Sequence, residues 1–130
     1  HVSLFHMLFF NLPPDDAFIT TSLEKAMYLV DESGVREYNT LKEKGYYNQI
    51  LSSSAVLSLQ GDSVRIDKDR FMYYGTQRIE RGSTIQYRRL VTTGSLRQVP
   101  RSENNPHGLI ITGWKTLDNT AIRDERKRSF

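Results

Sequence analysis

The residues best suited to chemistry in this sequence are three histidines and a run of serines. His1, His6 and His107 lack the HxxxH or HExxH spacing of a metal site, and the chain has no cysteine to complete one. The serines at 52–54 belong to no GxSxG motif, and nothing favours a Ser–His–Asp set. No glycine-rich phosphate loop occurs. We therefore expect no catalytic residue, cofactor or metal, with His6 a packed or flanking residue on an apolar helix and His107 exposed in a loop.

Aromatic and cationic residues alternate in the second half of the chain, where a binder of single-stranded nucleic acid could use them. The residues concerned are Tyr73, Tyr74, Arg78, Tyr87, Arg88 and Arg89. Aromatic residues on strands more often form core or cross-strand pairs, and we favour that interpretation. The basic residues of the C-terminal tail, which are Arg123, Arg126, Lys127 and Arg128, are offset by Asp124 and Glu125. Direct contact with nucleic acid is not expected, and a DNA-binding module stays an alternative.

The charge of the chain is distributed unevenly. Residues 1–61 contain four Lys or Arg and seven Asp or Glu, so their net charge is 4 − 7 = −3. Residues 62–130 contain fourteen Lys or Arg and eight Asp or Glu, so their net charge is 14 − 8 = +6. This asymmetry fits a polyanion site, subunits that meet acidic face to basic face, or simply a solvated surface.

A polar loop at residues 100–108 ends in the sequence Asn104-Asn105-Pro106-His107-Gly108. Asparagine and glycine tolerate unusual backbone angles, and proline fixes its own. The Asn-Pro-x-Gly stretch therefore predicts a rigid corner between two strands, and by itself it indicates only a turn.

The first half of the chain has the spacing of helices. Residues 2–12 are apolar at eight of eleven positions and predict a helix that packs into the core, packs against a partner or continues upstream. Pro13-Pro14 ends it. A buried stripe then predicts a second helix, formed by Ile19, Leu23, Ala26, Met27 and Val30. Ser33-Gly34 predicts a joint, followed by a helix that ends at Gly45 and a short turn of helix over 46–51.

After residue 54 the apolar period changes to two, which predicts strands. We expect strands over 55–59, 64–67, 71–81, 84–99 and 109–117, with turns at Gly61-Asp62 and at 81–83. In the longest strand the apolar parity changes between Ile85/Tyr87 and Leu90/Leu96, which predicts a bulge near residues 88–89 or Gly94. The tail after Asn119 is expected to fray.

Helices first and strands second predict one α+β domain, with the helices on one face of a curved antiparallel sheet of four to five strands. The length of 130 residues suits one domain, and 38% hydrophobic with 25% charged residues suits a soluble globular one. The sequence has no run of roughly 20 apolar residues, which a membrane helix needs. We expect apolar side chains of both halves to fill the hollow between helices and sheet.

Three segments of the sequence have a specific pattern, PPDDAFITTSLEKAMYLVDESGVREYNTLKEKGYYNQI, DSVRIDKDRF and YYGTQRIERGSTIQYRRLVTTGSLRQVPRSENNPHG. Together they resemble the TraK family of Bacteroides-type conjugative transposons. The resemblance runs from about Leu8 to Asn119, and the signatures YNxLKExGYY and SENNPHG are its most specific parts. That family is similar to the bitopic, VirB-eight-type inner-membrane component of type IV secretion systems.

The resemblance implies a cystatin-like or nuclear-transport-factor-like cone and an assembly role without enzymatic activity. It implies that the helix at 1–12 follows a membrane anchor and that residues 13–119 form a periplasmic α+β domain. The remaining residues, 120–130, are the basic tail that we expect to fray. Implied partners are further copies of the chain and other channel subunits. Implied interaction residues are Asn105, Pro106 and Gly108, where the family's Asn-Pro-x-Gly motif matches. A small-molecule-binding enzyme of the cone fold stays an alternative.

Overall fold

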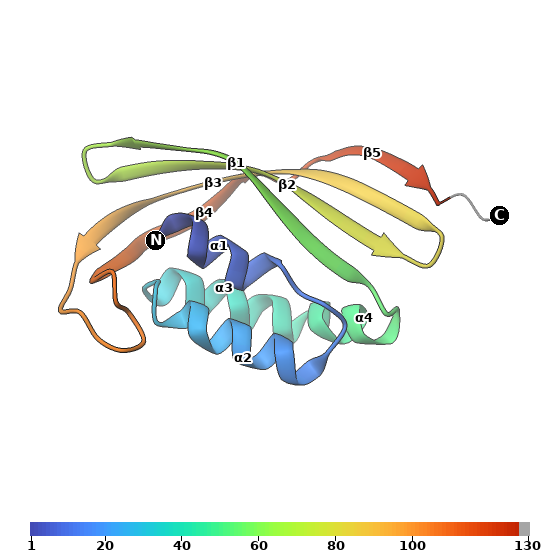
Figure 1. Ribbon diagram of the computed structural model, residues 1–130, viewed down its shortest axis with the longest axis horizontal. Coiled ribbons are helices and arrows are strands. Elements are labelled where there is room, and N and C mark those ends of the chain that lie inside the picture. The colour runs from blue at the N-terminus through green and yellow to red at the C-terminus, as the bar shows by residue number, and fades with distance from the viewer. Residues whose placement is uncertain (128–130) are drawn as a thin grey trace.

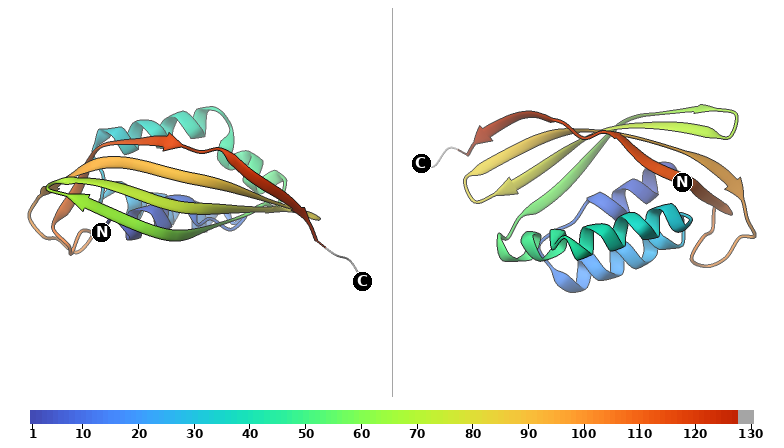
Figure 2. Two further views of the ribbon diagram at one scale, coloured as in Figure 1. Left: turned by 90° about the horizontal axis from the view of Figure 1, so that it is seen from above. Right: turned by 180° about the vertical axis from the view of Figure 1, so that it is seen from behind.

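The structure, a computed structural model, describes residues 1–127 and consists of four helices beneath a five-stranded antiparallel sheet (Figure 1). The helices are α1 (Val2–Phe10), α2 (Asp16–Met27), α3 (Glu32–Glu43) and α4 (Tyr46–Ser52), and the strands are β1 (Val56–Asp67), β2 (Arg70–Arg81), β3 (Thr84–Gln98), β4 (Leu109–Asp118) and β5 (Ala121–Arg126). All four helices lie on one face of the twisted sheet (Figures 1 and 2). The predicted α+β class is therefore confirmed. None of the helices within residues 1–127 has the length and apolar character to span a membrane.

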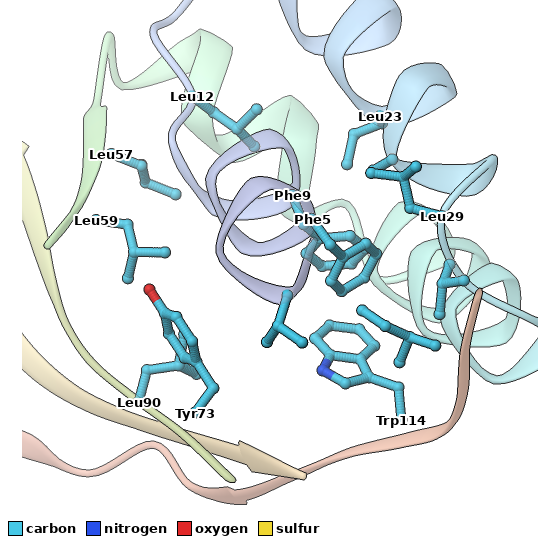
Figure 3. Packing of buried hydrophobic residues seen from close by; sticks show 14 of the residues in the cluster. Phe5, Phe9, Leu12, Leu23, Leu29, Leu57, Leu59, Tyr73, Leu90 and Trp114 are labelled. Atoms are coloured by element: carbon cyan, nitrogen blue, oxygen red, sulfur yellow. The ribbon is translucent and has the colours of Figure 1, made fainter. Parts of the chain in front are cut away.

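The apolar helix α1 lies between the sheet and the other helices. Phe5 and Phe9 are buried, and the centroids of both rings lie 4.9 Å from the ring of Trp114 on β4 (Figure 3). Side chains from α2, from β1 and from the segments that follow α1 and α2 complete this cluster, including Leu12, Leu23, Leu29, Leu57 and Leu59. Of the alternatives for this segment, packing into the core is the one observed.

His6 belongs to the same core, so of the two positions expected for it, packed or flanking, it occupies the packed one. Its imidazole stacks on Tyr73 at a centroid distance of 3.9 Å. The Nδ1–H group donates to the carbonyl of Val2 (2.7 Å), and Nε2 accepts from the hydroxyl of Thr92 (2.6 Å). Burial lowers the pKa of His6 from 6.5 to about 4, against the opposing effect of the bond to Val2. The ring is therefore neutral at neutral pH and acts as a packed core residue.

The joint between α2 and α3 differs from the prediction. We expected Val30 on the helix and a break at Ser33-Gly34, but α2 ends at Met27 and α3 begins at Glu32. The side chain of Asp31 accepts from the backbone N–H of Ser33 (3.0 Å) and caps α3, so Gly34 lies inside the helix. A Cβ at position 34 would lie 2.4 Å from Cγ1 of Val30, so glycine is needed for this close approach.

The β1–β2 hairpin is longer than predicted. Gly61-Asp62 was expected to form a turn, but β1 continues to Asp67, and its register shifts between Gly61 and Ser63. A glycine in a strand interior can mark a bulge as well as a turn, which explains the wrong prediction. The predicted turn at residues 81–83 is confirmed.

The long strand β3 is irregular at both predicted places. Its register shifts between Thr93 and Ser95 where it meets β4, and between Tyr87 and Arg88 where it meets β5. Its pairing with β2 has no register shift. Because side chains alternate regularly along an unbroken strand, Ile85 and Tyr87 face the convex side of the sheet, whereas Leu90 lies on the helix side.

The expectation of a frayed tail from 120 to 130 is wrong for residues 121–126. These residues form β5, which pairs with the first half of β3. All six side chains of β5 are exposed, so neither face of the strand needs to be apolar. The sequence therefore lacks the apolar alternation from which a strand could have been predicted. Residues 128–130 lie outside the described residues.

Candidate functional site

The loop that carries the predicted interaction motif is closed by backbone hydrogen bonds. Ser102 and Asn105 exchange two backbone N–H···O bonds of 3.1 Å, and the N–H of Gly108 donates to Asn105 (3.2 Å). The N–H of Val99 donates to the carbonyl of Gly108 at 3.0 Å. Gly108 has a φ of +65°, and a Cβ at this position would lie 3.0 Å from the carbonyl oxygen of Val99. This corner therefore requires glycine. The predicted rigid corner is confirmed.

Asn105 is buried and points into the molecule. Its amide nitrogen donates to the carbonyl of Leu109 (2.6 Å) and to that of Tyr28 (3.2 Å), the residue that caps the C-terminal end of α2. Its Oδ1 atom is buried without a hydrogen-bond partner among residues 1–127. Asn105 therefore ties the loop to the helical layer.

The three motif residues do not form one exposed surface. Asn105 and Gly108 are buried, whereas Pro106 and its neighbour His107 are exposed. The Nδ1 atoms of His107 and His1 lie 3.2 Å apart, and Nε2 of His1 donates to the carbonyl of Leu29 (3.1 Å). His107 was predicted to be exposed and is, but no local pattern indicated its contact with a residue 106 positions away. A partner contact by this motif stays a prediction.

The connector between α2 and α3 runs beside β4 next to this loop. The N–H of Ile111 donates to Leu29 (2.9 Å), and the N–H of Asp31 donates to Ile111 (2.8 Å). The carboxylate of Asp31 also accepts from the N–H of Gly113 (3.2 Å). We call this region, comprising residues 28–33, the loop 99–108 and residues 109–114, the pinned end.

The carboxylate of Asp31 accepts hydrogen bonds from both α3 and β4 at the pinned end. Partial burial works to raise the pKa of its carboxyl, but hydrogen bonds from Ser33 and Gly113, together with the nearby charge of Arg36, outweigh that effect. Its pKa therefore lies below the ordinary value, and the carboxylate is ionised at neutral pH.

The aromatic and cationic residues considered for nucleic acid divide between the two faces of the sheet. Tyr73 is buried in the core, and Arg88 lies on the helix side opposite Gln77. On the convex side, the guanidinium of Arg123 lies 4.1 Å from the centroid of Tyr87, and Arg78 forms a salt bridge with Glu80. The expectation of core and cross-strand pairs is met at Tyr73 and Tyr87, and the six residues do not form one platform.

The hollow beneath the sheet is not filled throughout, contrary to our expectation. A cavity of about 520 Å³ remains where α1, α3 and α4 face the strands near the β2–β3 hairpin. Its lining comprises Phe9, Phe10, Glu37, Leu41, Tyr46, Gln77, Ile79, Arg81, Gln86, Arg88, Leu90, Trp114, Thr116 and Asn119. Long polar side chains, including Gln77, Arg81 and Arg88, occupy helix-facing positions of β2 and β3 beside the cavity.

Few of the groups that acid–base catalysis uses line the cavity. It contains one carboxylate, Glu37, and the guanidinium groups of Arg81 and Arg88, but neither the imidazole nor the paired carboxylates of acid–base catalysis. The serines at 52–54 lie at the exposed end of α4. Within residues 1–127, no three His, Cys, Asp or Glu side chains are grouped closely enough to hold a metal ion.

Comparison with known proteins gives a structural match. No protein-family model and no curated protein matches the sequence. Among solved structures, the fold is similar to the crystal structure of the soluble domain of TrwG Type IV secretion machinery from Bartonella grahamii. The TM-score is 0.76 at 15% sequence identity, with 94% of this chain and 92% of that chain covered. At this identity the similarity establishes that the two domains share a fold.

Proposed function

We propose that this domain is a structural component of a conjugative type IV secretion channel, of the TraK type found in conjugative transposons. The observation that carries the proposal is the match to the TrwG soluble domain over nearly the full length of both chains. The segments that resemble the TraK family support it independently. In this proposal the domain lies in the periplasm behind an inner-membrane anchor and performs no catalysis.

The proposed mechanism is geometric. Asn105 and Gly108 hold the loop in one conformation, so that Pro106 and His107 are presented to a partner without a further cost of ordering the loop. Partners are a second copy of this chain and other channel subunits. A membrane anchor raises the local concentration of subunits, so contacts that are weak for the isolated domain suffice in the assembly.

The proposal can be tested in donor cells that lack the gene. Complementation with the full-length gene should restore transfer of the mobile element, and a vector without the gene should not. Normal transfer without the gene would refute the proposal.

Contacts of the loop can be tested in the same cells with a photo-crosslinking amino acid at position 107. We expect crosslinks to another copy or to a channel subunit during assembly. Ser83 is a matched control, because it is exposed in the β2–β3 turn, at the opposite end of the molecule from the loop (Figure 1). Crosslinks from position 83 but not from position 107 would exclude the loop as the contact surface.

A further inference from the structure

The cavity near the β2–β3 hairpin has the size and composition of a small-molecule site. Its volume of about 520 Å³ falls in the range of ligand pockets, roughly 300–1,000 Å³. It is bounded by three helices on one side and by the helix-facing side chains of the sheet on the other. The loop 99–108 contributes no residue to it, so this site is separate from the proposed interaction surface.

One wall of the cavity is apolar and aromatic. Trp114 and Leu90 are buried beneath it, and Phe10 lies half-buried with its ring centroid 6.0 Å from that of Trp114. Leu41 and Ile79 extend this wall from α3 and β2. Such a surface is suited to a hydrocarbon chain or a flat ring.

The opposite part of the cavity is cationic. Arg81 and Arg88 project from the helix side of the neighbouring strands β2 and β3. Burial raises the pKa of the Tyr46 phenol, and the positive charges of both arginines work to lower it. The salt bridges within residues 1–127 join other pairs, so neither arginine has a carboxylate within 4.0 Å in that part of the chain.

Arg88 is held in place by neutral partners. Its Nε donates to Oδ1 of Asn119 (3.3 Å), and one terminal nitrogen donates to the Asn119 carbonyl. Asn119 in turn donates to the side chain of Gln77 (2.6 Å). A guanidinium has five N–H donors, so these contacts orient the group and leave donors for an anion.

We propose that this cavity binds a small amphiphilic carboxylate. The apolar part of the ligand lies against Phe10, Leu90 and Trp114, and its carboxylate lies between Arg81 and Arg88. The lining charges are two positive and one negative, so an anion is favoured over a cation. Planar guanidinium groups match carboxylate geometry, and the apolar wall discriminates against small inorganic anions.

Trp114 supplies a direct assay, because it is the only tryptophan of the chain and lines the cavity. The purified 130-residue chain is titrated with decanoate, decanol and decyltrimethylammonium below their micelle concentrations, while tryptophan emission is recorded. We expect a saturable change with decanoate, binding of decanol weaker by about tenfold or more, and no binding of the cation. Absence of a response to decanoate, or equal affinity for decanoate and decanol, overturns the proposal.

Variants locate the site of binding. Arg88→Gln should lower the affinity for decanoate by about tenfold or more without changing the affinity for decanol. Arg89→Gln is the matched control, because Arg89 is the next residue of β3 and is exposed on the other face. Arg81→Gln, at an exposed position, provides a second test should Arg88→Gln unfold. Wild-type decanoate affinity in folded Arg88→Gln or Arg81→Gln contradicts the assignment.

Discussion

The two ends of the space beneath the sheet are built differently. Near the pinned end, aromatic rings of α1 and β4 pack closely, and the neutral His6 fills the remaining room. Near the β2–β3 hairpin, Arg81, Arg88 and Gln77 occupy equivalent helix-facing positions, and a cavity remains. One sheet therefore supports a rigid end suited to presenting a loop and an open end suited to holding a ligand. Phe9 and Trp114 border both parts, because they pack with Phe5 and also line the cavity.

The comparison predicts the largest loss of stability at the packed end. Phe5→Ala should lower the free energy of unfolding by about 3–5 kcal/mol, because the ring is fully buried and a void would remain. Phe10→Ala, on the same helix but beside the cavity, should cost less than about 2 kcal/mol. Urea unfolding of both variants measures this difference. Equal losses would show that the two ends are packed alike.

A second prediction concerns pH. The pKa of His6 is about 4 in the folded chain and 6.5 ordinarily, so between these values the unfolded chain binds more protons. Stability due to His6 is fully present above pH 6.5 and falls as the pH drops toward 4, by about 3 kcal/mol in all. Urea unfolding across this range should show the loss in the wild type and a smaller loss in His6→Gln. Identical pH profiles would contradict a buried neutral histidine.

A third prediction separates the two roles within the loop. Asn105→Ala should lower the free energy of unfolding by about 1–3 kcal/mol, because the carbonyls of Tyr28 and Leu109 lose their donor. Pro106→Ala, at an exposed position, should change it by less than about 0.5 kcal/mol. Thermal unfolding of the two variants checks this contrast. A larger effect at Pro106 than at Asn105 would reverse the assigned roles.

The smallest contrast between two variants is expected between Gly108 and Gly82. Replacement by alanine imposes a left-handed backbone on a residue with a Cβ and brings that atom close to the Val99 carbonyl, which should cost about 1–2 kcal/mol. Gly82→Ala is a useful control, because its φ is also positive (+53°) but nothing lies within 4 Å of its Cβ position. Comparison of the two unfolding midpoints isolates the steric part. A smaller loss at Gly108 than at Gly82 would argue against the crowded corner.

Much of the fold could be predicted because it is encoded by local periodicity. The helical stripe is buried as its spacing indicates, at Ile19, Leu23 and Ala26. The alternating residues of the first strand are buried on one face, at Leu57 and Leu59. Local patterns were misleading where backbone geometry decides the structure. Gly61 forms a bulge rather than a turn, and β5 pairs through its backbone while all its side chains are exposed.

The candidate sites depend on contacts between residues far apart in the sequence. Asn105 is buried because its amide reaches Tyr28, which lies 77 positions earlier. The cavity is lined by Gln77, Arg81 and Arg88 together with residues of α1 and α3, and no local pattern in the sequence specifies that these residues meet. The sequence indicated the motif residues, but it could not indicate which of them are buried.

The most direct test of the proposed assembly role is the transfer frequency of the mobile element in cells that carry a loop-surface variant. The double variant P106A/H107E changes only exposed side chains, and P100A is a control in the same loop. We predict that P106A/H107E lowers transfer by at least tenfold while the unfolding midpoint of the purified domain is unchanged, and that P100A transfers normally. Wild-type transfer by P106A/H107E would contradict the claim that this loop is the working surface of the domain.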